Sequence, residues 1–271
     1  MLELEERGAV TIVRLSHGKV NALDTDLLHA IAATMGSLPS AQAVVFTGAG
    51  HAFSAGVDLK RIAHGGMEYV KVFRPALSQA VRAVFDRPGP VVAAVNGHAI
   101  AGGCVLAAAC DLRLMSHGTI GLSEMRVGVP FPGVALEVVR HAAGTGARRL
   151  VLEAALLTPA EAVAAGLVDR VTAAGSLLDE AVAEAERLGR IPADVYAFTK
   201  RQLQAPARIR IDAISPADED AATAMWAAPA TQSAINGFLA RLSQREDAKG
   251  RRPAAAGYEH QGAPANDRST D

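Results

Sequence analysis

Hydrophobic and polar residues alternate at the start of the chain, and the pattern then changes to helical spacing. Residues 2–15 alternate in two short runs on either side of Arg7-Gly8, which predicts a β-hairpin. Asp24 or Thr25 can then cap a helix. The apolar positions expected on one face of this helix are Leu27, Leu28, Ile31 and Met35.

A repeated order of strand, helix and strand follows. Residues 43–47 and 91–95 are short apolar runs, typical of fully buried strands. Between them, a helix over 67–86 is predicted by apolar residues at helical spacing: Met67, Val70, Phe73, Leu77, Val81 and Val84. A further helix over 102–110 and strands over 112–115 and 118–122 come next. Buried strands that alternate with helices favour parallel pairing through helical crossovers, so the expected fold class is α/β.

From about residue 176 the pattern is purely helical. Four helices are expected, separated by Pro192, Pro206 and Pro229: 177–188, 194–203, 216–227 and 231–242. We expect 191–246 to form a C-terminal helical oligomerisation region, because a thin helical appendage would otherwise expose its apolar faces. The composition of 247–271 is charged and rich in glycine, proline and alanine, which predicts disorder.

Composition and charge exclude several classes of function. The net charge of −1 gives no electrostatic footprint for nucleic acid or for an anionic membrane. No apolar run approaches the roughly 20 residues of a membrane span, and the acidic N-terminus is unlike a targeting peptide. Cys104 and Cys110 have no metal-binding spacing and are expected to be buried. We therefore expect a cytoplasmic protein without a metal.

Two glycine-containing segments each follow a predicted strand. The first is Ala52-Phe53-Ser54-Ala55-Gly56-Val57-Asp58-Leu59, and the second is Asn96-Gly97-His98-Ala99-Ile100-Ala101-Gly102-Gly103-Cys104-Val105. The second precedes an apolar helix, whose N-terminus would add a positive dipole end. Each segment alone is typical of an ordinary tight turn, and their joint occurrence is more specific.

With Val20-Asn21-Ala22-Leu23 as a third match, the chain resembles the crotonase (enoyl-CoA hydratase/isomerase) family over about residues 8–245. This resemblance implies a spiral of repeated ββα units in a core over 1–190, which would bind acyl-CoA and carry out catalysis. It also implies an acyl-CoA substrate, no separate cofactor because coenzyme A is part of that substrate, and self-association as a homotrimer or homohexamer.

The resemblance also assigns two backbone donors. In the family, two N–H groups stabilise the negative charge on the thioester oxygen; carried over to this chain, they belong to Val57 and Gly102. One pre-oriented donor of this kind contributes roughly 2.7–4 kcal/mol to transition-state stabilisation. Ala101 stands where many relatives have glycine, a mild departure.

Glu124 matches the proton-transferring glutamate of the family, whereas Val105 stands where the hydratases carry a second one. The neighbours of Glu124, Leu122 and Met125, favour a pKa of this carboxyl that is raised by desolvation. The alternative is that Glu124 forms an ion pair with Arg126 at the surface. One carboxylate suffices to move a double bond from C3–C4 to C2–C3, but hydration needs a held water. The chain is therefore most similar to the Δ3-Δ2-enoyl-CoA isomerases. Hydration, with Glu137 or bound water compensating for Val105, and non-catalytic acyl-CoA binding are the alternatives.

Further residues match family positions around coenzyme A. Those expected to bind the substrate are Lys19, Val20, Ala22, Ala55, Gly56, Asp58, Leu59 and Gly103. Lys19, Lys60 and Arg61 are candidate phosphate contacts, and Arg241 is one contributed by a neighbouring subunit.

The remaining ionisable residues near the motifs are expected to be structural. Asp58 and Asp111 match turn-anchoring positions of the family. The loop residues His51, His98 and His117 have no metal-binding spacing.

Overall fold

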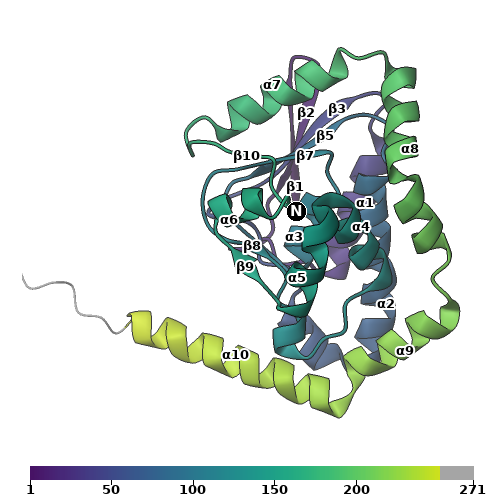
Figure 1. Ribbon diagram of the computed structural model, residues 1–271. Coiled ribbons are helices and arrows are strands. Elements are labelled where there is room, and N and C mark those ends of the chain that lie inside the picture. The colour runs from purple at the N-terminus through teal and green to yellow at the C-terminus, as the bar shows by residue number, and fades with distance from the viewer. Residues whose placement is uncertain (251–271) are drawn as a thin grey trace, which may run out of the picture.

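The computed structural model describes the backbone of residues 1–250 and the side chains up to Gln244 (Figure 1). The larger of two β-sheets has the strand order β1-β2-β3-β5-β7-β10. Its strands are β1 (Leu2–Arg7), β2 (Val10–Leu15), β3 (Ala43–Gly48), β5 (Val91–Val95), β7 (Leu112–Met115) and β10 (Arg170–Val171). β1 and β2 form the predicted antiparallel hairpin, and all the other neighbours pair in parallel.

A smaller sheet has the order β4-β6-β8-β9, in which only β9 runs antiparallel to its neighbour. Its strands are β4 (Ala52–Ser54), β6 (His98–Ile100), β8 (Ile120–Gly121) and β9 (Leu156–Leu157). Consecutive strands fall alternately into the two sheets, since β3, β5 and β7 belong to the larger sheet and β4, β6 and β8 to the smaller. A helix follows each such pair, so the predicted ββα repeat is confirmed.

Helices cover both faces of the larger sheet (Figure 1). Those preceding the C-terminal region are α1 (Thr25–Ser37), α2 (Leu59–Phe85), α3 (Gly102–Ala108), α4 (Gly133–Ala143), α5 (Ala147–Leu152), α6 (Pro159–Ala164) and α7 (Leu177–Gly189), with 3₁₀ turns η1 (Glu124–Val127) and η2 (Gly144–Gly146). Ile12 and Val45 pack with Ala181 of α7, whereas Val13 and Phe46 belong to the core formed with α1 and α2. Burial on both faces explains why these strands are continuously apolar.

The predicted helix over 67–86 begins earlier and is bent. α2 starts at Leu59, and Gly66 interrupts it with φ 53° and ψ −143°. Met67, expected on the buried face, is exposed. It directly follows the kink, where the helical phase restarts, so the apolar spacing read from Val70 onward does not extend back to it. The other five predicted core positions of this helix are buried.

Three helices follow in the C-terminal region: α8 (Ala193–Asp212), α9 (Pro216–Ala227) and α10 (Pro229–Gly250). Pro206 was expected to separate two helices but lies inside α8. Buried residues on both sides of it, Gln204 and Ile211, hold the helix to the core, and this packing outweighs the helix-breaking tendency of proline. Of the segment expected to be disordered, 247–250 belong to the end of α10, and residues 251–271 lie outside the described part.

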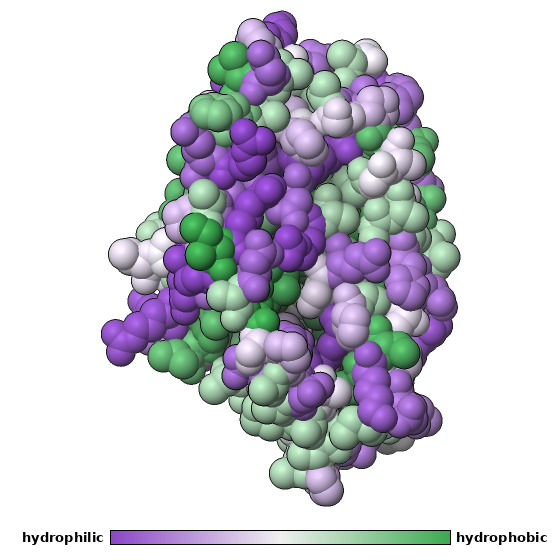
Figure 2. Space-filling view, turned by 90° about the vertical axis from the view of Figure 1, so that its right-hand side faces the viewer, coloured by the Kyte–Doolittle hydropathy of each residue, from purple (hydrophilic) through white to green (hydrophobic). Residues whose placement is uncertain are grey.

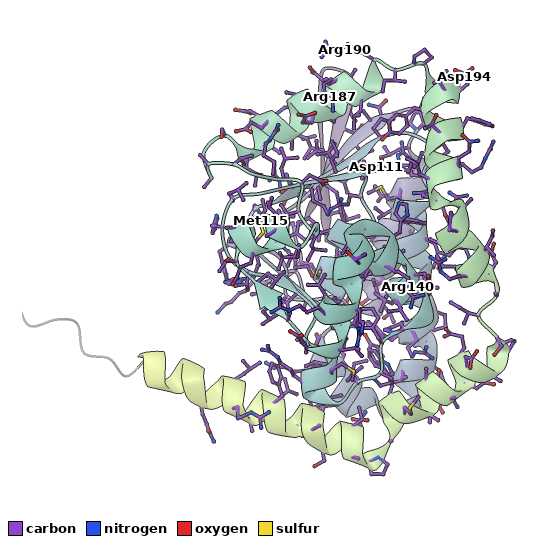
Figure 3. All side chains as sticks on the ribbon, viewed as in Figure 1. Asp111, Met115, Arg140, Arg187, Arg190 and Asp194 are labelled. Carbon is purple, nitrogen blue, oxygen red and sulfur yellow. The ribbon has the colours of Figure 1, made fainter. Side chains whose placement is uncertain are left out.

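Side-chain contacts fix α8 against the body of the protein. Lys200 Nζ lies 2.9 Å from the Asp111 carboxylate and donates to the carbonyl oxygen of Gly89 at 3.3 Å. Asp111 lies at the turn after α3, beside α8 (Figure 3). Four apolar residues of α8 remain at least half exposed: Val195, Phe198, Leu203 and Ile209. The α8 side of the molecule carries hydrophobic patches among hydrophilic residues (Figure 2). Within residues 1–250, no helix is both long enough and apolar enough to cross a bilayer.

Candidate active site

The ends of β4 and β6 bring the two glycine-containing segments together. These strands pair in parallel, so the segments that follow them, 55–57 and 100–102, leave the smaller sheet as neighbours. The approach is close at Gly56, where φ is +82° and a Cβ atom would lie 2.4 Å from the Ile100 carbonyl oxygen. The same Cβ would lie 3.3 Å from the Gly102 nitrogen. Only glycine permits both the conformation and the approach.

Asn21 fixes the first of these segments from outside the repeat. It is buried in a left-handed conformation with φ 51°. Its Nδ2 donates to the carbonyl oxygens of Ala52 at 3.0 Å and Phe53 at 3.2 Å. In return, Ser54 Oγ donates to the Asn21 carbonyl oxygen at 2.7 Å. The side chain of Asn21 thus provides the donor that the end of β4 needs.

The Val57 N–H is left available by the hydrogen bonds on either side of it. Leu23 N–H donates to the Gly56 carbonyl oxygen at 2.7 Å, and Asp58 N–H donates to the Leu23 carbonyl oxygen at 2.9 Å. Because both groups point towards Leu23, the Val57 N–H between them points to the opposite side, as in an extended strand. It has no acceptor within residues 1–250.

Gly102 begins α3 directly after a strained residue. Ala101 has φ 51° and ψ −121°, a conformation that is costly for a residue with a Cβ atom, of the order of 1–3 kcal/mol. Its N–H donates to the Gly121 carbonyl oxygen at 2.8 Å. The Gly102 N–H, at the first position of the helix, has no intrahelical acceptor. Ala101 stands where the resemblance implies glycine in many relatives, and the positive φ explains why glycine suits this position.

Glu124 begins η1 and is buried, with 8% of its surface exposed. Burial raises the pKa of this carboxyl to about 7, although the backbone N–H groups of Glu124 and Ser123 act in the opposite direction. Its Oε2 atom has no hydrogen-bond partner within the part of the chain described. The alternative of a surface pair with Arg126 is wrong, since no such ion pair forms there. The carboxyl is therefore poised to exchange a proton near neutral pH.

These parts surround a single small cavity of about 80 Å³. Its lining residues are Ala55, Val57, Leu59, Ile100, Ala101, Ser123, Glu124, Val127, Val129, Trp226 and Phe238. Glu124 supplies the one carboxylate among them. Gly102 does not itself line the cavity but follows Ala101, which does. The cavity thus joins the Val57 segment, the start of α3 and Glu124.

Trp226 and Phe238 were missed as cavity residues. Both belong to the region over 191–246, which was expected to cover its apolar faces by self-association. Trp226 of α9 is 2% exposed and donates from Nε1 to the Pro130 carbonyl oxygen at 2.9 Å. Phe238 lies on α10 of the same chain. No local signal identifies them, because they are roughly a hundred residues from Glu124 in sequence.

A larger cavity of about 480 Å³ lies between α8 and the turn after α3. Its wall holds the ion pair of Lys200 and Asp111, at 2.9 Å. Burial, followed by the positive charge of Arg113, lowers the pKa of His141 at its wall. None of the motif residues reaches this cavity, so the candidate site is the smaller one.

The other candidate acids have structural contacts. Asp58 Oδ1 accepts from the N–H groups of Lys60 at 3.0 Å and Arg61 at 3.1 Å, which caps α2. Glu137 of α4, the candidate second carboxylate, does not line the cavity. Both of its oxygens are paired, with Arg140 at 2.7 Å and with Arg210 of α8 (Figure 3 shows Arg140 on α4).

Of the residues predicted to bind coenzyme A, some line the cavity and others lie beside the segment that lines it. Leu59 and Ala55 line the cavity, and the Val20 carbonyl oxygen accepts from the Ala55 N–H at 2.9 Å. Gly103 is buried, and a Cβ there would lie 2.4 Å from the Ser54 carbonyl oxygen, so it serves close packing. The exposed Lys19 and the half-buried Ala22 lie on the loop that holds this segment.

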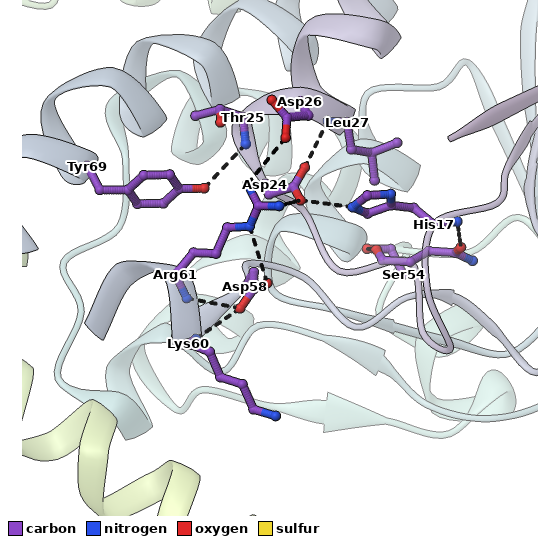
Figure 4. A network of polar contacts seen from close by, with 11 residues as sticks. His17, Asp24, Thr25, Asp26, Leu27, Ser54, Asp58, Lys60, Arg61 and Tyr69 are labelled. Carbon is purple, nitrogen blue, oxygen red and sulfur yellow. Dashed lines mark hydrogen bonds and ion pairs between the residues drawn. The ribbon is translucent and has the colours of Figure 1, made fainter. Parts of the chain in front are cut away.

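Arg61 takes part in an ion-pair network rather than projecting alone. It lies 3.1 Å from Asp24 and 3.3 Å from Asp26 (Figure 4). Burial opposes ionisation of Asp24, but the Leu27 N–H, His17 and Arg61 together lower its pKa. Arg241, on α10, is exposed and does not line the cavity of its own chain. Within the described residues, no cluster of His, Cys, Asp or Glu is placed to hold a metal.

The chain is similar to known proteins over most of its length. Residues 5–246 match the family model described as enoyl-CoA hydratase/isomerase. A putative enoyl-CoA hydratase of Thermus thermophilus is 36% identical over 208 residues, which cover 74% of this chain and 82% of that protein. Enoyl-CoA delta isomerase 3 of Arabidopsis thaliana is 30% identical over 222 residues, 75% of this chain and 92% of that one. In fold, the chain is similar to human mitochondrial delta3-delta2-enoyl-CoA isomerase, with a TM-score of 0.85 at 23% identity, covering 90% of this chain and 99% of that chain.

Proposed function

The chain belongs to the enoyl-CoA hydratase/isomerase family, and within that family we propose that it converts 3-enoyl-CoA thioesters to trans-2-enoyl-CoA. The observation that carries the proposal is the buried carboxyl of Glu124, whose Oε2 has no partner among the described residues and whose pKa burial raises to about 7. A base with this pKa is ionised in an appreciable fraction at neutral pH and still binds the proton that it removes.

The proposed reaction needs one proton carrier and one oxyanion site. Glu124 removes a proton from C2 of the acyl group, and the electrons move into the thioester carbonyl to form a dienolate. The N–H groups of Val57 and Gly102 stabilise the negative oxygen, each by roughly 2.7–4 kcal/mol relative to the ground state. Glu124 then returns the proton to C4, and the double bond is left between C2 and C3. The enzyme ends the cycle in its starting protonation state.

Hydration is disfavoured by what surrounds Glu124. Adding water requires a water molecule held over C3, and in the hydratases two carboxylates hold it. Val105 is 1% exposed and offers neither donor nor acceptor. Glu137 is occupied by Arg140 and Arg210, so it is not available to compensate. The remaining wall is apolar except for Ser123, which favours a reaction without water.

A pair of assays tests this proposal. With a 3-enoyl-CoA, we expect absorbance of the conjugated 2-enoyl thioester to appear. With crotonyl-CoA, we expect that absorbance to persist. Its loss at a comparable rate would assign hydration instead, and tight acyl-CoA binding without either reaction would leave a non-catalytic binder.

We propose that coenzyme A is bound by the residues that match the family positions. Lys19, Val20 and Ala22 would bracket the nucleotide and the pantetheine arm together with the segment from Ala55 to Leu59. Arg241 would reach the phosphates of the coenzyme A that is bound by a neighbouring subunit. Replacement of Lys19 by alanine should weaken binding of coenzyme A itself, and a salt-dependent loss in a calorimetric titration would support a phosphate contact.

We also propose self-association as a homotrimer or homohexamer in the cytoplasm. The support is the exposed apolar surface of α8, formed by Val195, Phe198, Leu203 and Ile209. Light scattering after size-exclusion chromatography would give the number of subunits, and a monomer at micromolar concentration would contradict the proposal. Cell fractionation would test the location.

A further inference from the structure

One wall of the cavity is supplied by the chain's own C-terminal helices. Trp226 of α9 and Phe238 of α10 line it together with Val127 and Val129, which adjoin η1. These four side chains carry no charge, and they share the cavity with Glu124. If the acyl group lies beside Glu124, as the proposed function requires, this wall limits the space available to the acyl tail.

Polar contacts fix this wall in place. The Trp226 indole donates to the Pro130 carbonyl oxygen at 2.9 Å, and Thr231 Oγ donates to the Gly128 carbonyl oxygen at 3.2 Å. Both bonds tie the C-terminal helices to the loop that follows η1. The Trp226 ring also packs against Phe73 of α2, with the ring centres 6.1 Å apart.

A buried arginine adds a second attachment. Arg74 of α2 is 3% exposed, and its guanidinium donates to the Glu219 carbonyl oxygen at 2.6 Å and to the Glu219 carboxylate at 2.8 Å. It also contacts Thr223, one turn further along α9. Displacing α9 would leave this guanidinium buried without its partners, which is costly. A long acyl chain therefore cannot simply push the wall aside.

The cavity itself is small. At about 80 Å³, the cavity has roughly half the 150 Å³ that holds a benzene ring in an engineered apolar cavity. We infer that Trp226 and Phe238 set the acyl-chain length and restrict the substrate to short, uncharged acyl groups, on the order of four carbons. This inference rests on the proposed function only in placing the acyl group beside Glu124, and it does not depend on which reaction follows.

Trp226 is the single tryptophan of the chain, so its fluorescence reports directly on this wall. Titration of the full-length protein with butanoyl-CoA should change the intensity or wavelength of the emission. Coenzyme A without an acyl group should leave both nearly unchanged at the same occupancy, measured by calorimetry. An identical response to the two ligands would mean that the acyl group does not reach Trp226, and the inference would fail.

Saturated acyl-CoA thioesters of four to ten carbons then measure the length limit without requiring any reaction. We expect the parent protein to bind butanoyl-CoA at least tenfold more tightly than decanoyl-CoA, since each methylene that does not fit costs roughly tenfold or more. Trp226→Ala should reduce or reverse this ratio by a similar factor. Trp226→Phe, which keeps an aromatic wall, should give an intermediate ratio and guards against a loss of folding in the alanine variant.

Leu4→Ala is the control, because Leu4 is an exposed apolar residue of β1 that lies outside the cavity and outside the α8 surface. It should leave the length preference unchanged. If the parent protein binds all chain lengths equally, or if Trp226→Ala leaves the ratio unaltered in a folded protein, the inference is overturned. If the length preference follows these expectations but no 3-enoyl-CoA is isomerised, the proposed reaction fails and the inference on chain length stands.

Discussion

Two glutamates, Glu124 in η1 and Glu137 in α4, are buried to nearly the same extent, with 8% and 7% of their surfaces exposed. Their surroundings differ. Glu137 has both oxygens paired with arginine side chains, one of them from α8. Glu124 has an oxygen without any partner in the described part of the chain, and burial raises its pKa to about 7.

This contrast indicates that the lack of a counter-charge, and not burial itself, makes a carboxyl suitable for proton transfer. The paired carboxylate of Glu137 ties α4 to α8 through Arg210. An unpaired one is destabilised when ionised, because a low-dielectric site disfavours the charge. Glu124 is thus placed for chemistry at the expense of stability, and Glu137 stabilises the packing of α4 against α8.

The largest contrast is expected in activity. Glu124→Gln keeps the size of the side chain but removes the proton carrier, so kcat/KM for 3-enoyl-CoA should fall roughly 10²–10⁴-fold. Binding of butanoyl-CoA, measured by calorimetry, should change little. Glu137→Gln is the matched control and should keep kcat/KM within a few-fold of the parent value. An isomerisation rate for Glu124→Gln equal to that of the parent would show that another group is the base.

The same substitution should stabilise the protein at high pH. The pKa of Glu124 rises on folding from an ordinary value of 4.5 to about 7, so the unfolded chain loses this proton more easily. Stability is therefore lost as the pH rises from about 4.5 to 7, and above 7 the ionised carboxylate costs about 3 kcal/mol. Urea unfolding should find Glu124→Gln more stable than the parent at pH 8 by about this amount.

At pH 4, where the carboxyl is protonated in both states, that gain should largely disappear. Comparing the two pH values separates the titration of Glu124 from any change in packing caused by the amide. An equal difference in unfolding free energy at both values would contradict the raised pKa.

The pH dependence of activity gives a third test. A base must be ionised before it removes a proton, so kcat/KM should rise about tenfold per pH unit below pH 7 and level off above it. At pH 5 the value should be about 100-fold below the plateau. Glu137→Gln should show the same inflection, because its carboxylate plays no part in the reaction. A profile of the parent that is flat between pH 5 and 8 would exclude a base with this pKa.

Much of the spiral core was predictable because its signals are local. Apolar runs, glycines after strands and the repeated order of elements lie within short stretches of sequence, and the structure confirms the strands over 43–47 and 91–95. The start of α2 was not predictable from spacing, since the kink at Gly66 changes the phase of the helix. The inclusion of Pro206 in α8 depends on tertiary packing that outweighs a local preference.

For the site, the sequence singled out Glu124, and the structure shows that its burial has a further source. We attributed its desolvation to Leu122 and Met125, and Leu122 is buried, but Met125 is half exposed. Distant side chains of the same chain, Trp226 and Phe238, complete the enclosure. Hydrophobic spacing tells which face of a helix is apolar, but it does not tell which part of the molecule that face will meet.

The smallest effect in the comparison concerns the stability of the Glu137 contacts. Glu137→Gln removes the charge shared with Arg140 and Arg210, both of which are nearly half exposed and therefore partly screened by solvent. The free energy of unfolding should fall by about 1–2 kcal/mol, the range for hydrogen bonds to a charged group reduced by this screening. Urea unfolding at pH 8 measures the change, and combining Glu137→Gln with Arg210→Met in a double-mutant cycle isolates the contact between α4 and α8.

The loss at Glu137 and the gain at Glu124 have opposite signs at the same pH, so two substitutions of the same chemical type distinguish a paired from an unpaired buried carboxylate. A gain in stability for Glu137→Gln would mean that desolvation also dominates at Glu137, and the contrast between the two glutamates would not hold.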